Sequence, residues 1–454
     1  MGRGRYEEPT GIYREAHKTM LNDNSLREIA QARFDPGSGT LWTKPQYESY
    51  CFSQIPATIT RLLTGVGDAG LPEDVLGSLP QRYQRVVLFF VDAFGWRFLE
   101  RYADRYPALQ RLVDEGVVSK LTAQFPSTTS AHVACIHTGL PVGQSGVYEW
   151  NIYEPQLDRI ITPLLWSFVG DKTRNTLEPT GIAADEVLPR GDFYRNLRRA
   201  GVQPAIFQPA EYTPSPYTNV VTTGVDPDQL HGYKTWPEAL TQLTERLLQP
   251  VASGQAYYYV YFDKIDTIGH IYGPSSPHFD AEVDSFWTTM ERLFFRKVAG
   301  HVADTLVMIT ADHGQIETDP RTTLYLNRDL DAQRIRRYLQ RNRAGDVLAP
   351  AGSARDMFLH VRDEYLAEAH TYFKAALTGH AEMYLTSELI GNGFFGSEAP
   401  SRRLLDRVGN LVILPYAHET VWWYEPERFV QSNYGHHGGL TPEEMETPLF
   451  CYAL

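Results

Sequence analysis

Three separate runs of apolar residues each lead into acidic or histidine side chains. The runs are "VVLFFV" at 86–91, "YYYVYF" at 257–262 and "DTLVMIT" at 304–310. Apolar runs of this length are typical of strands that are buried on both faces of a parallel sheet. They lead to Asp92, to Asp263, Asp266 and His270, and to Asp312 and His313. Sites in parallel α/β sheets form at the carboxyl ends of the strands, so we expect these side chains to meet there.

Two further segments carry polar side chains of the same kind. "NYGHHGG" at 433–439 sets His436 and His437 among glycines, and it predicts a loop whose backbone can approach a ligand closely. "PSTTS" at 126–130 presents four consecutive hydroxyls after a proline, which is typical of the start of a helix. A helix N-terminus stabilises both an alkoxide and a bound phosphate, so one of these hydroxyls is a candidate nucleophile.

The residue types at these five places predict a site for divalent metals. Asp266 and His270 are four residues apart, so on a helical turn they lie on one face and can bind one ion. Imidazole and carboxylate groups together suit zinc, manganese or iron. There are too many of these groups for one ion and about enough for two. Two ions can clamp the attacking and leaving oxygens of a phosphoryl transfer.

Composition excludes several classes of protein. The 454 residues are 43% hydrophobic, which gives ample material for a core, and the formal charge of −13 argues against a duplex nucleic acid partner. The three cysteines are far apart and form no CxxC pair, so we expect neither a disulfide framework nor a thiolate zinc site. There is no apolar signal-peptide region and no run of 18 apolar residues, so we expect no membrane span and a cytoplasmic location.

Five of these pieces together resemble one family. "VDAFG", "FPSTTSAH…HTG", "DTIGHIYGP", "ADHG" and "GHHGG" occur in the same order as in the type I phosphodiesterase/nucleotide pyrophosphatase branch of the alkaline phosphatase superfamily. The resemblance covers residues 46 to 454. It implies an α/β fold, namely a three-layer α/β/α sandwich with a mostly parallel central sheet and a cap insertion.

The resemblance also implies a role for individual residues. One metal would be held by Asp92, Asp312 and His313, with Thr129 bridging as the nucleophile. The second metal would be held by Asp266, His270 and His437. Thr128 and His436 are the alternates to Thr129 and His437, and Asp263 would lie outside the ligand set. Asn151 would bind a phosphate oxygen, although its register is shifted by about one residue from the family pattern.

The chain divides in this interpretation into an N-terminal extension at 1–45 and a catalytic domain at 46–454. Residues 320–405 would form a cap beside the metals, and "GNLVILPYA" at 409–417 would return to the main sheet. We expect the basic stretch at 334–343 to be the solvated side of a surface helix. Trp422 and Trp423 are expected to pack rather than to stack on a base, and His132, His137 and His418 are expected to be structural.

The predicted function is that of a metal-dependent phosphodiesterase acting on small nucleotide or related phosphate esters. Two divalent ions are expected, with zinc favoured and manganese as the alternative. Two other functions stay open: a phosphomonoesterase or phosphonate hydrolase with the same metals, and a non-catalytic metal or nucleotide binder. The natural substrate and the oligomeric state do not follow from the sequence.

Overall fold

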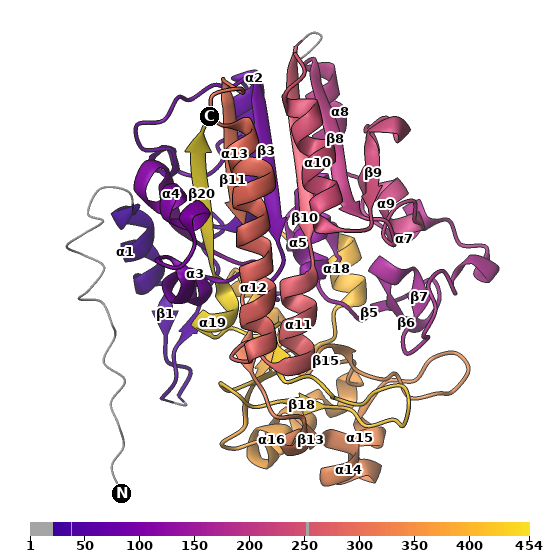
Figure 1. Cartoon of the computed structure of the whole chain (residues 1–454). Coiled ribbons are helices and arrows are strands. Elements are labelled where there is room, and N and C mark those ends of the chain that lie inside the picture. The colour runs from indigo at the N-terminus through magenta and orange to yellow at the C-terminus, as the bar shows by residue number, and fades with distance from the viewer. Residues whose placement is uncertain (1–20, 38, 251–253) are drawn as a thin grey trace, which may run out of the picture.

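A seven-stranded sheet forms the centre of the computed structural model, which describes residues 21–37, 39–250 and 254–454 (Figure 1). The strand order is β4-β20-β11-β3-β10-β8-β9. The strands are β4 (Val117–Thr122), β20 (Glu446–Ala453), β11 (Thr305–Thr310), β3 (Arg85–Val91), β10 (Gln255–Phe262), β8 (Val202–Pro209) and β9 (Leu230–Tyr233).

β20 runs opposite to the other six described strands of this sheet. It is antiparallel to both β4 and β11, whereas the pairs β11–β3, β3–β10, β10–β8 and β8–β9 are parallel. The three apolar runs of the sequence are therefore the adjacent strands β3, β10 and β11. The prediction of a mostly parallel central sheet is confirmed.

Helices cover both faces of the sheet, because alternate strand residues point to opposite sides. Val86, Leu88 and Phe90 belong to one core, which includes residues of α2 (Ile55–Thr64) and α5 (Thr129–Thr138). Val87 and Phe89 belong to the other core, which includes residues of α3 (Trp96–Tyr102), α4 (Pro107–Glu115), α10 (Trp236–Leu247) and α12 (Pro277–Thr289). The three-layer sandwich is thereby confirmed (Figure 1).

A second, smaller sheet lies beyond the carboxyl ends of β3 and β11 (Figure 1). Its antiparallel order is β14 (Ala351–Gly352), β15 (Met357–Leu359), β17 (Leu411–Pro415) and β16 (Ala381–Leu385). α15 (Ala332–Tyr338), α16 (Leu366–Ala376) and α17 (Thr386–Gly391) belong to the same part of the chain. The limits 320–405 for a cap stay a prediction.

The expected return to the main sheet at 409–417 is wrong. β17 lies in this segment and pairs with β15 and β16, while β20 is the strand that returns to the main sheet. Both segments are apolar and buried, so composition does not distinguish them. Their partners are decided by contacts that are distant along the chain.

The described part of the N-terminal segment packs against the sheet domain. α1 (Asp23–Gln31) follows Asn22, whose backbone N–H donates to the carbonyl of Val118 in β4 at 2.8 Å. Trp42 is fully buried, and Arg33 forms an ion pair with Glu446 at 2.6 Å. Residues 1–20 of the predicted extension lie outside the described residues, and the boundary at residue 45 stays a prediction.

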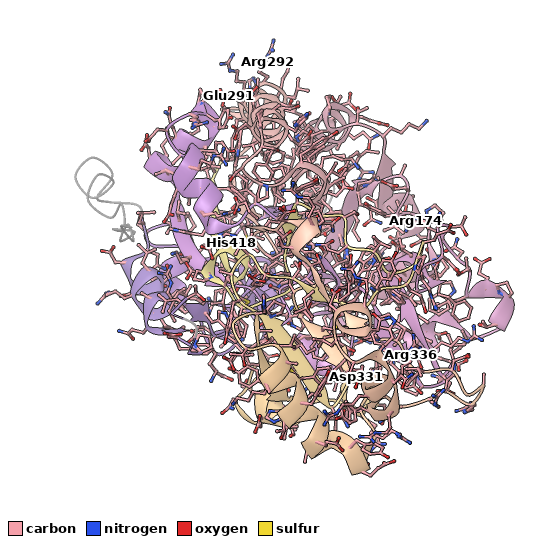
Figure 2. The ribbon with its side chains drawn as sticks, turned by 90° about the horizontal axis from the view of Figure 1, so that it is seen from below. Arg174, Glu291, Arg292, Asp331, Arg336 and His418 are labelled. Carbon is pink, nitrogen blue, oxygen red and sulfur yellow. The ribbon has the colours of Figure 1, made fainter. Side chains whose placement is uncertain are left out.

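The basic stretch at 334–343 begins in α15 and forms part of the surface. Arg334 and Arg337 both reach Glu368, at 3.1 and 2.9 Å. Arg336, which is labelled near Asp331 in Figure 2, lies over the ring of Trp423. The expectation of a surface helix is confirmed up to Tyr338, where α15 ends. Trp422 and Trp423 are buried, as expected of packing residues. Within the described ranges, no helix is long and apolar enough to cross a membrane.

Candidate active site

The strands β3, β10 and β11 end at one edge and bring their polar residues together. The N–H of Asp92, just after β3, donates to the carbonyl of Phe262, the last residue of β10, at 2.9 Å. One carboxylate oxygen of Asp312, just after β11, accepts from the N–H groups of Ala93 and His313 at 3.1 and 3.0 Å. These contacts hold the carboxylates of Asp92 and Asp312 at the same end of the sheet.

The helix after β10 supplies the next pair of predicted ligands. α11 (Lys264–Tyr272) carries Asp266 and His270 on one face, with His270 Nε2 3.3 Å from Asp266 Oδ2. The segment at 435–437 lies against this helix, and His437 Nε2 is 3.2 Å from His270 Nε2. Asp266 and His270 thus lie on one face of a helix, as their spacing of four residues predicted.

Two groups of ligand atoms result, and they share one residue. Asp266, His270 and His437 form the first group, and Asp92, Asp266 and His313 form the second; within each group the ligand atoms lie within 4.8 Å of one another. Asp312 lies beside the second group, with Oδ2 3.2 Å from His313 Nε2. This oxygen is buried and has no hydrogen-bond partner in the described part of the chain.

The three histidines each have one ring nitrogen fixed by a backbone carbonyl. Nδ1 of His270, His313 and His437 lies 2.7, 3.0 and 2.9 Å from the carbonyls of Gly435, Gly314 and Ser127. A carbonyl only accepts, so each Nδ1 donates to it and each Nε2 faces the site, where it can bind a metal once it carries no proton. Nε2 of His270 and Nε2 of His437 lie 3.2 Å apart and face the same space as the carboxylate of Asp266. These histidines and the unpartnered oxygen of Asp312 therefore fit a metal site.

The pKa values of the carboxylates also favour a metal site. Burial, together with the nearby Asp312 and Asp266, raises the pKa of Asp92 well above its usual value, and burial raises the pKa of Asp312. Burial also acts to raise the pKa of Asp266, but the charges of His270, His437 and His313 outweigh it and hold this pKa low. Carboxylates packed this closely require positive charge nearby to stay ionised.

Thr129 lies beside the second group of ligands. It is the first residue of α5, and its Oγ1 is 3.1 Å from His313 Nε2 and 3.4 Å from Asp92 Oδ1. The hydroxyl of Thr128 instead donates to the carbonyl of Tyr148 at 3.2 Å and caps α5 by accepting from the N–H of Ala131. Of the two candidate hydroxyls, the one at Thr129 faces the carboxylates and imidazoles.

The structure also distinguishes His436 from His437 as a candidate metal ligand. His436 belongs to β19 (Gly435–His436), which pairs with β12 (Ile316–Glu317), so the expectation of a loop without strand is wrong for these two residues. Burial lowers the pKa of His436 to about 3, and its Nδ1 is 2.9 Å from the carbonyl of His437. His437, but not His436, contributes to the groups of ligand atoms.

The histidines of α5 are buried. His132 has both ring nitrogens engaged, one by the N–H of Gln124 at 2.8 Å and one by the carbonyl of Thr128 at 2.7 Å. His137 makes a hydrogen bond of 2.7 Å with the hydroxyl of Tyr194. The structural role expected of His132 agrees with these contacts, and His137 also contributes to a cavity wall.

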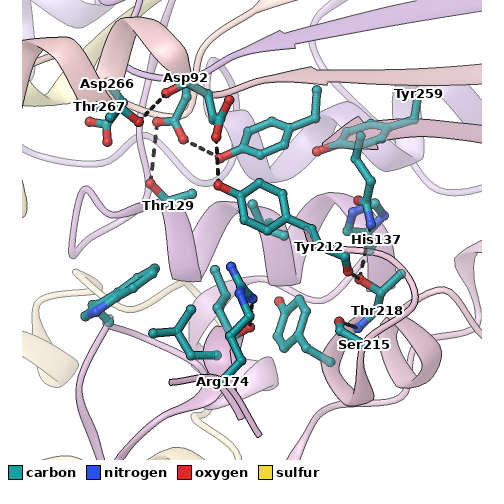
Figure 3. A pocket seen from close by; sticks show the side chains of 18 residues that line it. Asp92, Thr129, His137, Arg174, Tyr212, Ser215, Thr218, Tyr259, Asp266 and Thr267 are labelled. Carbon is teal, nitrogen blue, oxygen red and sulfur yellow. Dashed lines mark hydrogen bonds between the residues drawn. The ribbon is translucent and has the colours of Figure 1, made fainter. Parts of the chain in front are cut away.

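A cavity of about 200 Å³ opens beside Thr129 and runs away from the ligand groups (Figure 3). Its walls include Trp150, Arg174, Tyr212, Tyr217 and Tyr259. The sequence pattern indicated no site role for the first four, and it placed Tyr259 in the buried strand at 257–262. Arg174 and Tyr212 lie in loops that have no periodic pattern, so no local signal identifies them.

Asn151 and Asp263 lie apart from the ligand groups. The amide of Asn151 accepts from the hydroxyl of Thr162 at 3.0 Å, and its backbone carbonyl accepts from the N–H of Gly352 at 2.7 Å. Asn151 is not among the lining residues of the cavity, whereas Trp150 is. Its role toward phosphate stays a prediction. Asp263 lines the cavity and accepts from the hydroxyl of Tyr212 at 2.7 Å.

Comparisons with known proteins agree with this geometry. The sequence profile of the family described as "Type I phosphodiesterase / nucleotide pyrophosphatase" matches residues 86–439. Ectonucleotide pyrophosphatase/phosphodiesterase family member 3 of Mus musculus is 24% identical over 249 residues, and that of Rattus norvegicus is 24% identical over the same length. Each match includes 51% of this chain and 25% of the relative, so the chain spans about a quarter of these relatives.

Solved structures share the fold. Murine ectonucleotide pyrophosphatase/phosphodiesterase 5 superposes with a TM-score of 0.61 at 17% identity, covering 81% of this chain and 88% of that chain. An inactive threonine-to-alanine form of the murine protein, in complex with AMP, has a TM-score of 0.60 at 16% identity with the same coverage. The human protein has a TM-score of 0.60 at 15% identity, again with 81% and 88% coverage.

Proposed function

This chain belongs to the type I phosphodiesterase/nucleotide pyrophosphatase family, and we propose from that membership that it is a metal-dependent phosphodiesterase acting on small nucleotide or related phosphate esters. The observation that carries the proposal is the position of Thr129. Its hydroxyl lies at the start of α5, within 3.4 Å of both His313 and Asp92. A nucleophile beside metal-ligand groups is what a two-step phosphoryl transfer needs.

Two divalent ions are part of the proposal, with zinc favoured and manganese as the alternative. Carboxylate and imidazole ligands without cysteine suit both. Asp92, Asp312 and His313 would hold one ion, and Asp266, His270 and His437 the other. Bound there, the ions would supply positive charge that acidifies a hydroxyl and neutralises a transferring phosphoryl group.

Thr129 is the proposed nucleophile. Its oxygen attacks phosphorus as the bond from phosphorus to the leaving oxygen breaks, which gives a phosphothreonine ester. Water then attacks the same phosphorus, and the bond to Thr129 breaks to restore the free hydroxyl. The positive end of the α5 dipole favours both the alkoxide and the phosphoryl oxygens. The inactive threonine-to-alanine form of the murine relative supports a threonine in this role.

The test is turnover at known metal content. The protein is stripped with a chelator, restored with zinc or manganese, and assayed with bis-p-nitrophenyl phosphate beside p-nitrophenyl phosphate. Faster cleavage of the diester, lost on chelation and regained on restoration, is the expected result. Faster cleavage of the monoester would instead support the phosphomonoesterase alternative. No turnover of either ester with two ions bound would contradict hydrolysis and leave the binding alternative.

The remaining expectations are proposals of the same kind. The substrate is a small phosphate ester, and no duplex nucleic acid is expected on a chain of charge −13. A cytoplasmic location is supported by Cys51, Cys135 and Cys451, which are all unpaired and buried.

A further inference from the structure

We propose that Arg174 binds a second anionic group of the substrate, so that the preferred diesters carry a carboxylate or a phosphate at the end of one ester arm. This inference rests on the proposed function and adds the class of substrate to it. It concerns the cavity beside Thr129, which borders Asp92 and Asp266 of the metal-ligand groups and extends from them to Arg174 (Figure 3).

Arg174 is held in the wall of the cavity opposite Thr129 (Figure 3). It lies between β7 (Ser167–Phe168) and η4 (Glu178–Thr180). Its guanidinium carbon is 5.0 Å from the centre of the Tyr212 ring, and one N–H group donates to the carbonyl of Leu164 at 3.5 Å. A guanidinium has five N–H groups in a rigid fork. These two contacts orient the side chain and leave most of its donors unused.

The acidic residues of the cavity do not neutralise Arg174. Asp92 and Asp266 belong to the groups of metal ligands, and Asp263 accepts from Tyr212 and from Lys264 at 2.7 and 3.1 Å. No carboxylate lies within ion-pair distance of Arg174 in the described part of the chain. It is the only arginine or lysine among the lining residues. Arg174 is therefore a cation of the cavity wall that forms no ion pair with a described residue.

Two buried hydroxyls provide a second, independent sign of a ligand. Tyr217 and Tyr259 both line the cavity, are 4% and 0% exposed, and have hydroxyls without a hydrogen-bond partner among the described residues. Burial raises the pKa of both tyrosines, so both stay protonated and can donate. Buried polar groups are normally satisfied. An acceptor-rich group of a ligand would satisfy these hydroxyls as well as Arg174.

The size and the aromatic surface of the cavity favour a short anionic arm over a nucleobase. A volume of about 200 Å³ is small beside the roughly 300–1,000 Å³ of pockets that enclose drug-sized ligands. The face of Tyr212 is already covered by the guanidinium of Arg174, which leaves that face closed to a base. A carboxylate or phosphate, in contrast, can pair with the edge of the same guanidinium through two parallel hydrogen bonds.

The experiment uses matched p-nitrophenyl diesters with the metal-restored protein. Their second arm is 3-carboxypropyl, 3-phosphonopropyl, or the uncharged carboxamide analogue of the carboxypropyl group. We expect kcat/KM to be about tenfold or more higher for at least one anionic arm than for the carboxamide. Arg174→Gln should remove this preference, so that kcat/KM becomes equal for the anionic arms and the carboxamide arm. The better of the two anionic arms identifies the carboxylate or the phosphate as the group recognised.

Two variants separate recognition from a general loss of structure. Arg174→Lys keeps the charge and should keep part of the preference, which a purely structural role would not require. Arg159→Gln is the matched control, because Arg159 is also stacked on a ring, that of Phe168, but does not line the cavity. Equal turnover of the three diesters by the unchanged protein, or a preference that survives Arg174→Gln, would overturn the inference.

A binding measurement distinguishes this inference from the proposed function. Calorimetry with 4-phosphonobutanoate and its carboxamide needs no turnover, since neither contains an ester bond. We expect the carboxylate to bind about tenfold more tightly to the unchanged protein and equally to Arg174→Gln. If no diester is cleaved but this difference is found, hydrolysis fails while the anion subsite stands. If diesters are cleaved without any difference in binding or turnover, the subsite fails alone.

Discussion

The imidazole rings of His313 and His437 lie face to face, with centroids 3.6 Å apart and planes 13° apart. His313 follows β11, and His437 follows β19, so the contact joins two distant parts of the chain. The two rings belong to different groups of ligand atoms. The stacked rings therefore lie between the two proposed metal positions. A substitution of one histidine removes a packing contact from the other.

Removing His437 should cost one of the two proposed ions. We expect His437→Ala to lower the metal content from two ions per chain to one, because the group of Asp266, His270 and His437 loses a ligand. Turnover should fall by about 100-fold or more. Elemental analysis of the restored protein measures the content directly. His436→Asn is the control, since His436 is adjacent and buried but does not contribute to the ligand groups. Loss of an ion from the His436 variant alone would reverse the assignment.

Thr129→Ala should lower turnover by about a thousandfold or more while two ions stay bound, because the attacking oxygen is removed. Thr129→Ser keeps an oxygen in place and should retain measurable turnover. Mass spectrometry of quenched reactions should find the phosphoryl group on residue 129 of the unchanged protein. Thr128→Ala removes a helix cap and should cost about 1 kcal/mol of stability without abolishing turnover. Full activity of Thr129→Ala would exclude it as the nucleophile.

Glu149 and Asp356 form a buried acidic pair whose ionisation should oppose folding. Burial raises the pKa of Glu149 to about 7, and burial together with Glu149 raises that of Asp356. A folded-state pKa above the unfolded value means that the protonated pair favours folding. This contribution is present at acidic pH and is lost as the pH rises from the usual glutamate range through about 7.

Glu149→Gln should therefore raise the melting temperature at pH 8 by a few degrees and change it less at pH 5. Thermal unfolding at the two pH values measures the difference. Glu73→Gln is the control, because the side chain of Glu73 is 79% exposed. A Glu149 variant that is less stable than the unchanged protein at pH 8 would contradict the raised pKa.

The ion pair between Arg355 and Glu444 should be the most sensitive link between the small sheet and the site. Its two hydrogen bonds measure 2.9 and 2.8 Å, and both side chains are fully buried. Arg355→Ala leaves an unpaired buried carboxylate at Glu444, so we expect a loss of about 3–5 kcal/mol in the free energy of unfolding. Denaturant titration measures this loss. Arg402→Ala breaks an exposed pair with Asp406 and should cost less than about 1 kcal/mol.

Much of the sheet and of the candidate site follows from local patterns in the sequence. Strand residues alternate between two faces and helix residues recur every 3.6 positions, so the apolar run of β3 and the shared face of Asp266 and His270 are visible in one short window. The position of Asp92 at a strand end follows from the same run. These features depend on neighbours along the chain, which a single sequence contains.

Features that depend on distant contacts did not follow from the sequence. β17 and β20 are both apolar strands, and only their partners determine which one enters the main sheet. Asp266 contributes to both groups of ligand atoms, although the resemblance assigned it to one. Arg174 and Tyr212 meet across the cavity from separate loops, where no periodic pattern indicates a contact.

The position of β20 has a consequence for how the protein is made on the ribosome. β4 joins the rest of the seven-stranded sheet only through β20, which lies between it and β11. Until residues 446–453 have been synthesised, the facing edges of β4 and β11 have no strand between them. Unpaired strand edges are prone to pair with other chains. We therefore expect these two edges of the nascent protein to be open to pairing with other chains until this strand has emerged from the ribosome.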